Sequence, residues 1–381
     1  MRKMIREFIE PTKKEKRYLW DHAVFVFDTN VLLNLYRYSA TTRKSLFAAF
    51  KSFQDRLWIP YQVAYEFMCD RCQVIFETVL RYDKFSKEIK TFTDRAIELL
   101  RLTPDDSEIS DLTHYLSSWL ENNKKNNLLV TDTEEDEILT EILEIFDKKV
   151  GDIIDDTELS AIRDEGKKRF DKSIPPGFMD MNKKKEQDDN NTYGDLIIWK
   201  QILKYAKDKK VGIIFVTHDQ KEDWWNTING KTIGPRIELR REFINETHQK
   251  FHMYTMNSFI STYNEINAKK IEKRAVAEIS NFEIYNNLNL SRQNELIERI
   301  SRTEEVINNI ESRIRRRRLT LSSINRKYQN RDLECPPEIQ LQYDNTKIKI
   351  SELECELNNQ KKLLIALKHD IRNQDVHFIN I

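Results

Sequence analysis

At 381 residues, the chain is long enough for a large domain and a second module. Lys plus Arg and Asp plus Glu both total 63, which excludes a net charge that would attract nucleic acid or a membrane, so any such affinity must come from local patches. No apolar run approaches the ~20 residues of a membrane span, and the first residues are charged where a signal peptide is apolar. We therefore expect a cytoplasmic protein.

The first predicted strand follows a polar lead-in, residues 1–22. Val24 to Phe27 are β-branched or aromatic, as in a buried strand, and Asp28 follows directly. In open α/β sheets, sites lie beyond the carboxyl ends of the strands. Asp28 is therefore a candidate site residue. Its alternative role is to cap the helix that follows.

A second acidic residue follows the next predicted strand. We expect a helix over residues 41–53, a short strand over 57–59, and a helix from Tyr61 that carries Glu66 in its first two turns. Residues 72–172 then show only amphipathic helical patterns, which indicates a helical insertion.

Two further acidic residues lie in the second half of this region. Asp195 opens a predicted helix after an irregular stretch, residues 173–193, and a helix N-terminus favours an ionised carboxylate. Residues 211–217 are the most strand-like run in the chain. They end in His218 and Asp219, which repeats the pattern of the first strand.

Alternating strands and helices predict a parallel sheet, in which Asp28, Glu66, Asp195 and Asp219 converge on one edge. Carboxylates ~4 Å apart repel by a few kcal/mol at an effective dielectric of about 20, so such a pocket needs cations. Ligands that are all oxygen suit Mg²⁺ or Mn²⁺. Two such ions can activate water and stabilise the leaving oxygen in phosphodiester hydrolysis.

The motifs around these residues resemble those of PIN-domain nucleases. They are Val-Phe-Asp-Thr-Asn, Pro-Tyr-Gln-Val-Ala-Tyr-Glu-Phe, Tyr-Gly-Asp-Leu-Ile-Ile-Trp-Lys and Phe-Val-Thr-His-Asp. The chain is most similar to the PIN-like group with a helical insertion, through Pro-Pro-Gly-Phe and Lys-Glu-Asp-Trp-Trp. The resemblance covers roughly residues 20 to 262.

This resemblance implies a metal-dependent endonuclease of a kind that most often acts on RNA. Carried over to this sequence, the catalytic metal ligands would be Asp28, Glu66, Asp195 and Asp219. The same comparison implies supporting roles for Asn30 and Thr217 and a further metal ligand in Asp223.

Other residues near the motifs have alternative interpretations. Lys183, Lys184 and Lys185 would either hold the substrate's phosphate backbone or be a solvated loop. His218 would either contact substrate or be a bystander, the interpretation that we favour. The pair Trp224-Trp225 offers a surface for base stacking, but tandem tryptophans more often close a core.

The last part of the sequence has a different periodicity. Apolar residues recur every seven positions from Ile300 to Tyr328, and a second heptad pattern runs from Ile350 to Ile371, with Cys335-Pro336-Pro337 between them. Two such helices joined by a proline turn should form an antiparallel coiled-coil hairpin. Within it, the basic run Arg315, Arg316, Arg317 and Arg318 is a candidate site for nucleic acid or an acidic partner.

We therefore predict an α/β fold with a central parallel sheet flanked by helices, a helical insertion and a C-terminal antiparallel coiled-coil hairpin. The expected domains are a lead-in (1–22), a PIN-like nuclease domain (23–262, with the insertion at 72–172) and a coiled-coil arm (263–381).

The predicted function is two-metal hydrolysis of RNA, with tRNA among the candidates. The arm would serve a protein partner or self-association, and the architecture would suit a regulated system such as defence against phage. No glycine-rich phosphate loop occurs, so we expect no nucleotide cofactor. Because no long apolar run occurs, we also expect no membrane partner. The alternatives are a structure-selective DNA nuclease and a catalytically silent PIN-like scaffold.

Overall fold

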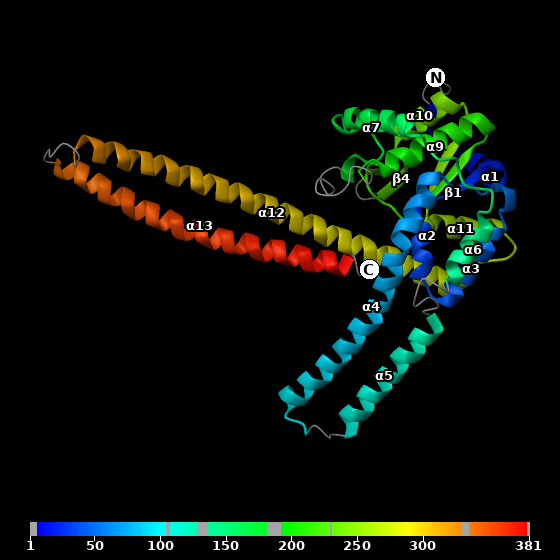
Figure 1. Ribbon diagram of the computed structural model, residues 1–381, viewed down its shortest axis with the longest axis horizontal. Coiled ribbons are helices and arrows are strands. Elements are labelled where there is room, and N and C mark those ends of the chain that lie inside the picture. The colour runs from blue at the N-terminus through cyan, green and yellow to red at the C-terminus, as the bar shows by residue number, and fades with distance from the viewer. Residues whose placement is uncertain are drawn as a thin grey trace. The chain divides into compact units, whose positions relative to one another are not determined.

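The computed structural model describes residues 6–103, 107–127, 136–180, 192–228, 231–328 and 335–378 (Figure 1). Its centre is a parallel sheet of three strands in the order β1-β2-β5. The strands are β1 (Val24–Phe27), β2 (Ile213–Thr217) and β5 (Phe251–Thr255). Helices cover both faces, which explains why β1 and β2 are continuous apolar runs rather than alternating ones. The predicted fold class is confirmed.

The two faces of the sheet pack against different helices. On one face, Phe25 and Phe27 contact aromatic rings of α1 (Lys13–His22), α3 (Ala40–Lys51) and α11 (Met256–Ile266). On the other face, Phe251 contacts Trp199 of α9 (Gly194–Lys209) and Phe243 of α10 (Ile237–Thr247). Helix α2 (Thr29–Leu33) follows β1 directly. The short helices are η1 (Arg6–Phe8), η2 (Asn34–Tyr36), η3 (Gln54–Arg56) and η4 (Phe178–Asp180).

Two expectations about the first sixty residues need correction. The lead-in is not merely polar, because Leu19 and Trp20 of α1 are buried in the core. The strand expected over 57–59 is reduced to two isolated bridges, Phe25 with Leu57 and Ile59 with Val150. The segment bonds to a different neighbour on each side, and Pro60, which lacks a backbone N–H, follows it at once.

A small antiparallel pair of strands lies between β2 and β5 in sequence. It consists of β3 (Trp225–Ile228) and β4 (Lys231–Pro235), and the pairing has an irregularity between Asn226 and Thr227. The pair places Trp225 next to the end of β2.

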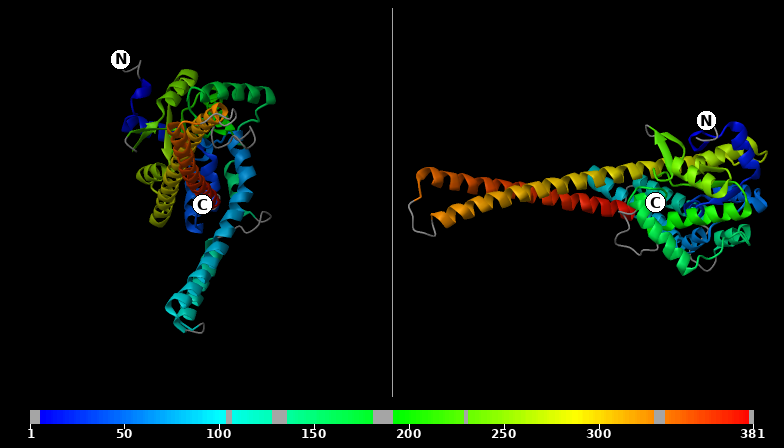
Figure 2. Two further views of the ribbon diagram at one scale, coloured as in Figure 1. Left: turned by 90° about the vertical axis from the view of Figure 1, so that its left-hand side faces the viewer. Right: turned by 90° about the horizontal axis from the view of Figure 1, so that it is seen from above.

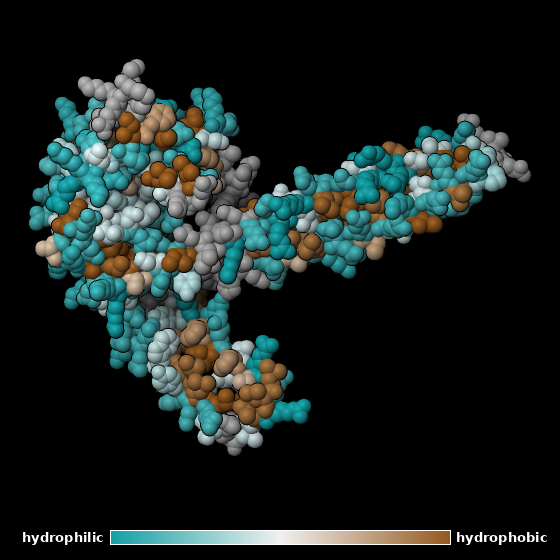
Figure 3. All heavy atoms as spheres, turned by 180° about the vertical axis from the view of Figure 1, so that it is seen from behind, coloured by the Kyte–Doolittle hydropathy of each residue, from teal (hydrophilic) through white to brown (hydrophobic). Residues whose placement is uncertain are grey.

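The predicted helical insertion is present. It begins within α4 (Tyr61–Leu100) and continues through α5 (Ser107–Asn127), α6 (Glu137–Ile145) and α7 (Asp156–Phe170). Helices α4 and α5 pack side by side (Figures 1 and 2). Their far ends expose apolar side chains, among them Leu99, Leu100 and Tyr115, and Figure 3 shows apolar atoms gathered there.

The chain divides into two compact units, residues 1–283 and 284–381. The first turns of α12 (Lys273–Lys327) belong to the first unit, where Ala275 and Ile279 join its core. The domain limits expected from the sequence stay a prediction. Among the described residues, none of the helices combines the length and the apolar character that crossing a membrane requires.

The second unit is the predicted antiparallel hairpin of α12 and α13 (Pro337–Phe378) (Figure 2). Ion pairs between the helices give the direction, because Glu311 pairs with Lys361 and Glu304 pairs with Lys368. Its small apolar cluster has Ile310, Ile314, Ile350 and Leu353 at its centre.

Candidate active site

Asp28 occupies the point where β1 ends and α2 begins. It is the N-cap of α2, and its Oδ1 accepts a hydrogen bond from the backbone N–H of Thr29 (2.8 Å). Its Oδ2 accepts from Thr217 Oγ1 (2.6 Å) and from Asn30 Nδ2 (2.7 Å). The capping role is thus present, and the second oxygen is turned toward the neighbouring strand.

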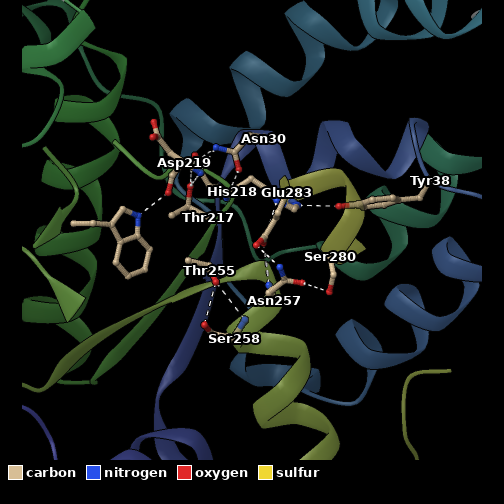
Figure 4. A network of polar contacts seen from close by, with 12 residues as sticks. Asn30, Tyr38, Thr217, His218, Asp219, Thr255, Asn257, Ser258, Ser280 and Glu283 are labelled. Carbon is tan, nitrogen blue, oxygen red and sulfur yellow. Dashed lines mark hydrogen bonds and ion pairs between the residues drawn. The ribbon is translucent and has the colours of Figure 1, made fainter. Parts of the chain in front are cut away.

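Thr217, the last residue of β2, joins the ends of the two central strands. Its hydroxyl oxygen accepts hydrogen bonds from Asn30 Nδ2 (3.2 Å) and from the backbone N–H of Asp219 (2.9 Å). Asn30 Oδ1 accepts from the backbone N–H of His218 (2.9 Å). Figure 4 shows Asn30, Thr217 and Asp219 converging. Parallel pairing of β1 with β2 therefore brings the two strand-end aspartates into one network.

Glu66 reaches the same edge of the sheet from α4. Its Oε2 accepts a hydrogen bond from the hydroxyl of Thr29 (2.7 Å), and its Oε1 accepts one from Gln62 Nε2 (2.9 Å). Thr29 directly follows Asp28. A Cβ atom on Gly194 would lie 2.5 Å from Glu66 Oε1, so the start of α9 touches this carboxylate. Glycine at 194 allows that close approach.

Asp195 and Asp219 border this edge. Asp195 lies in the first turn of α9, directly after Gly194, and Trp224 Nε1 is 3.4 Å from its Oδ2. Asp219 follows β2, and its carboxylate accepts from the backbone N–H of Lys221 (2.8 Å) and pairs with Lys221 Nζ (3.0 Å).

The electrostatics tie three of these carboxylates together. The pKa of Asp28 is raised to about 7, first by burial and then by the charges of Glu66 and Asp219, although hydrogen bonds from Thr217 and Thr29 act to lower it. Because Asp28 senses both charges, the three groups are near neighbours. A cation at this edge would relieve the cost of ionising Asp28.

Residues 24–239, more than half of the sequence, match the family model described as PIN like domain. The chain belongs to the PIN-like domain family. No curated protein matches it, and no solved structure matches it either. PIN-like domains are typically nucleases and generally use divalent metal ions.

The acids of this PIN-like domain do not form a ready metal site. Within the parts of the chain that the structure describes, no three His, Cys, Asp or Glu side chains are grouped so that they could hold an ion. Glu66 is engaged with Thr29 and Gln62, and Asp219 with Lys221. The donors are nevertheless carboxylate oxygens throughout, which is the set that fits Mg²⁺ or Mn²⁺.

Asp223, expected as a further metal ligand, has described contacts elsewhere. It is fully buried, and its Oδ2 accepts from the backbone N–H groups of Gly177 (3.0 Å) and Met179 (3.3 Å). These bonds fix the Pro-Pro-Gly-Phe segment, which lies beside Asp195. A Cβ atom built on Gly177 would be 3.2 Å from Asp195 Cβ. The metal role of Asp223 stays a prediction. Lys183, Lys184 and Lys185 lie outside the described residues.

The described contacts of the His218 ring are with Tyr38 and Glu283, not with the four candidate acids. Its Nε2 lies 3.0 Å from the Tyr38 hydroxyl and its Nδ1 lies 3.7 Å from Glu283 (Figure 4). Burial lowers the pKa of His218 to about 3 and raises the pKa of Glu283 to about 7, so this contact does not depend on a charged imidazole. The described contacts favour the bystander interpretation.

Trp224 and Trp225 are both buried in the core. Trp224 packs on Phe215 of β2, and Trp225 Nε1 donates to the carbonyl of Asp219 (2.6 Å). The pair therefore closes the core, and one of its members also fixes the backbone of a candidate acid.

Four residues at the site escaped the sequence reasoning: Thr29, Gln62, Gly194 and Lys221. All four lie inside the motifs quoted above, beside or near the acids to which those motifs assign a role. Gln62 lies four residues before Glu66, so the spacing of helix neighbours was an available signal. Nothing in the sequence pattern indicated that Lys221 pairs with Asp219.

Proposed function

We propose that this protein is a metal-dependent endonuclease that hydrolyses phosphodiester bonds, with RNA as its substrate. The observation that carries the proposal is the hydrogen-bond network at one sheet edge, in which Thr217 bonds to Asp28 and to the backbone of Asp219, and Thr29 bonds to Glu66. Membership of a family whose domains are typically nucleases supports it. The preference for RNA rests on the resemblance to PIN-domain nucleases.

In this proposal, Asp28, Glu66, Asp195 and Asp219 hold one or two Mg²⁺ or Mn²⁺ ions. When bound, such ions supply an activated water and stabilise charge on the leaving oxygen. The chain's own residues orient the ligands: Thr217 and Asn30 hold Asp28, and Gln62 holds Glu66.

In this proposal, an ion competes with the present partners of two acids. These partners are the Thr29 hydroxyl at Glu66 and the Lys221 ammonium group at Asp219. Lys221 would then be released beside the substrate's phosphate. Asp28 has hydrogen bonds to both of its oxygens, from Thr217 and Asn30 at Oδ2 and from the backbone of Thr29 at Oδ1, which restrain its orientation.

A second candidate function, a silent PIN-like scaffold, is favoured by one observation. Lys221 forms an ion pair with Asp219 (3.0 Å), so it neutralises one of the candidate acids. A scaffold would use the fold and the arm for binding without chemistry.

The deciding experiment is cleavage of a labelled pool of tRNA, single-stranded RNA and single-stranded DNA with Mn²⁺, Mg²⁺ or EDTA. Wild type is compared with Asp28→Ala, Asp195→Ala and the control Asp155→Ala, which removes only the cap of α7. We expect cleavage of RNA that needs metal, vanishes in the two site variants and persists in the control.

Three results would contradict the proposal in different ways. Cleavage confined to DNA would favour a DNA nuclease. Cleavage that survives both site variants would place the chemistry elsewhere. No cleavage, together with no Mn²⁺-dependent rise in melting temperature, would favour the scaffold.

A further inference from the structure

Positive charge is concentrated in the last turns of α12, the end from which the chain passes to α13. Residues 312–327 include seven basic residues and no acidic residue. They form the orange end of α12 in Figure 1. Arg315, Arg316 and Arg318 are exposed to solvent. We call residues 312–327 the basic end.

The facing helix does not neutralise the basic end. Arg318 pairs with Glu354 (2.6 Å), which sets residues 345–360 of α13 alongside it. The two segments together carry nine basic and three acidic residues. The adjoining section of the same hairpin, residues 295–311 with 361–377, carries six basic and seven acidic residues. The excess charge is therefore local.

The ion pairs show the same contrast. In the balanced section, Lys361 and Lys368 each pair with a glutamate of α12, at 2.8 and 2.7 Å. Of the basic end, Arg315, Arg316 and Arg317 have no carboxylate within ion-pair distance among the residues that the structure describes. Like charges three or four positions apart on a helix destabilise it, so α12 bears a cost here that a bound anion would remove.

A hollow between the two helices adds hydrogen-bond donors at this point. Its volume is about 490 Å³, and Arg317 and Lys349 line it with Asn345 and Thr346. Glu338 is the one acidic residue among its described lining. Guanidinium, ammonium, amide and hydroxyl groups are the donors that contact phosphate oxygens in nucleic-acid complexes.

We propose that the basic end of α12 binds the phosphodiester backbone of a nucleic-acid chain. Arginine forks bind phosphate bidentately, and neutralising several phosphates releases counterions, so the binding depends strongly on salt. Residues 312–327 contain no aromatic side chain, so their contact would be with the phosphate backbone and not with stacked bases. The choice of nucleic acid as the bound polymer rests on the proposed nuclease function. The excess of positive charge is independent of that proposal.

The test measures binding without cleavage. Full-length chain carrying Asp28→Ala is titrated in EDTA against a fluorescent 30-nucleotide single-stranded RNA over a range of salt concentrations. The test variant adds Arg315→Gln, Arg316→Gln and Arg317→Gln. The matched control adds Lys361→Gln, Lys362→Gln and Lys368→Gln, which removes the same charge from the balanced section. Circular dichroism verifies that the arm stays helical in both.

We expect the arginine variant to bind at least tenfold more weakly at low salt, with a salt slope shallower by roughly two, since each single-strand contact contributes about 0.7. The control should stay within about twofold of its parent. Equal losses in both variants, or no loss in either, would overturn the proposal.

Two further titrations distinguish the sources of negative charge. Single-stranded DNA of the same sequence reports whether the sugar matters, and binding of either polymer through the arginines supports the backbone proposal. Polyglutamate that displaces RNA at equal charge concentration would overturn it in favour of an acidic protein. Because no cleavage occurs in this assay, a negative binding result would contradict the binding proposal without contradicting the proposed nuclease function.

Discussion

At the residue scale, the buried carboxylate of Asp28 is the feature with the clearest consequence. Its pKa in the folded chain is about 7, against about 3.9 in an unfolded chain. The folded state therefore binds this proton more tightly, and the metal-free protein loses stability as the pH rises from about 4 to about 7. Above that range the loss is complete.

Replacing Asp28 by Asn tests this charge. Without metal, the free energy of unfolding of Asp28→Asn at pH 8 should exceed that of wild type by up to a few kcal/mol, at about 1.4 kcal/mol per pKa unit, and its melting temperature should be higher. Both differences should vanish near pH 4. Thermal denaturation in EDTA at the two pH values measures it. A difference independent of pH would contradict the charge argument.

Lys221 gives a second prediction at this scale. Its ammonium group is 3.0 Å from Asp219 Oδ2, where it competes with any cation that this carboxylate binds. Lys221→Met should therefore raise the affinity for Mn²⁺ several-fold, as measured by isothermal titration calorimetry without substrate. Lys204→Met, which breaks an ion pair with Glu158 on α7, is the control and should leave Mn²⁺ binding unchanged. Unaltered or weaker binding in Lys221→Met would count against competition.

At the scale of elements, α1 is the clearest departure from the sequence-based expectation. Its composition is strongly polar, and only Leu19 and Trp20 are buried. Trp20 nevertheless contacts Phe25, Phe53 and Phe259, so two apolar residues suffice to anchor the helix on the sheet. A pattern of two buried positions in ten residues is too short for periodicity to reveal.

Trp20→Ala should therefore destabilise the first unit by about 3–5 kcal/mol, the usual cost of removing a buried aromatic side chain. Urea denaturation followed by circular dichroism measures the loss. The control Tyr18→Ala removes an exposed ring from the same helix and should cost far less. Similar costs for the two would show that α1 is not part of the core.

At the scale of the whole molecule, each compact unit has its own apolar cluster. All six tryptophans lie in the first unit, so tryptophan fluorescence reports that unit alone. Leu353 is buried at the centre of the cluster in the arm, whereas Leu363 on the same helix is exposed.

Leu353→Asp should consequently melt the arm without melting the first unit. Placing an unpaired carboxylate in that small cluster removes its apolar contacts and adds a desolvation cost. The expected result is a loss of helical signal at a lower temperature with an unchanged tryptophan transition. Leu363→Asp should leave both signals in place. A tryptophan transition that shifts with Leu353→Asp would show that the units unfold together.

The sequence by itself determined the elements whose apolar pattern is long or whose strand is fully buried. Strands β1 and β2, the helical insertion and the heptad hairpin were predictable because burial on both faces, or on one helix face, imposes a pattern on consecutive residues. The positions of Asp28 and Asp219 followed in the same way, since each comes directly after a buried run.

Only the tertiary structure decided which groups face one another at the site. The contact of Thr29 with Glu66 and the close approach of Gly194 to the same carboxylate depend on how α2, α4 and α9 pack around the sheet. The same packing turns Asp223 toward the backbone of Gly177 and His218 toward Tyr38. Side-chain direction arises from contacts between segments that are distant in sequence, and a local pattern of residue types carries no record of it.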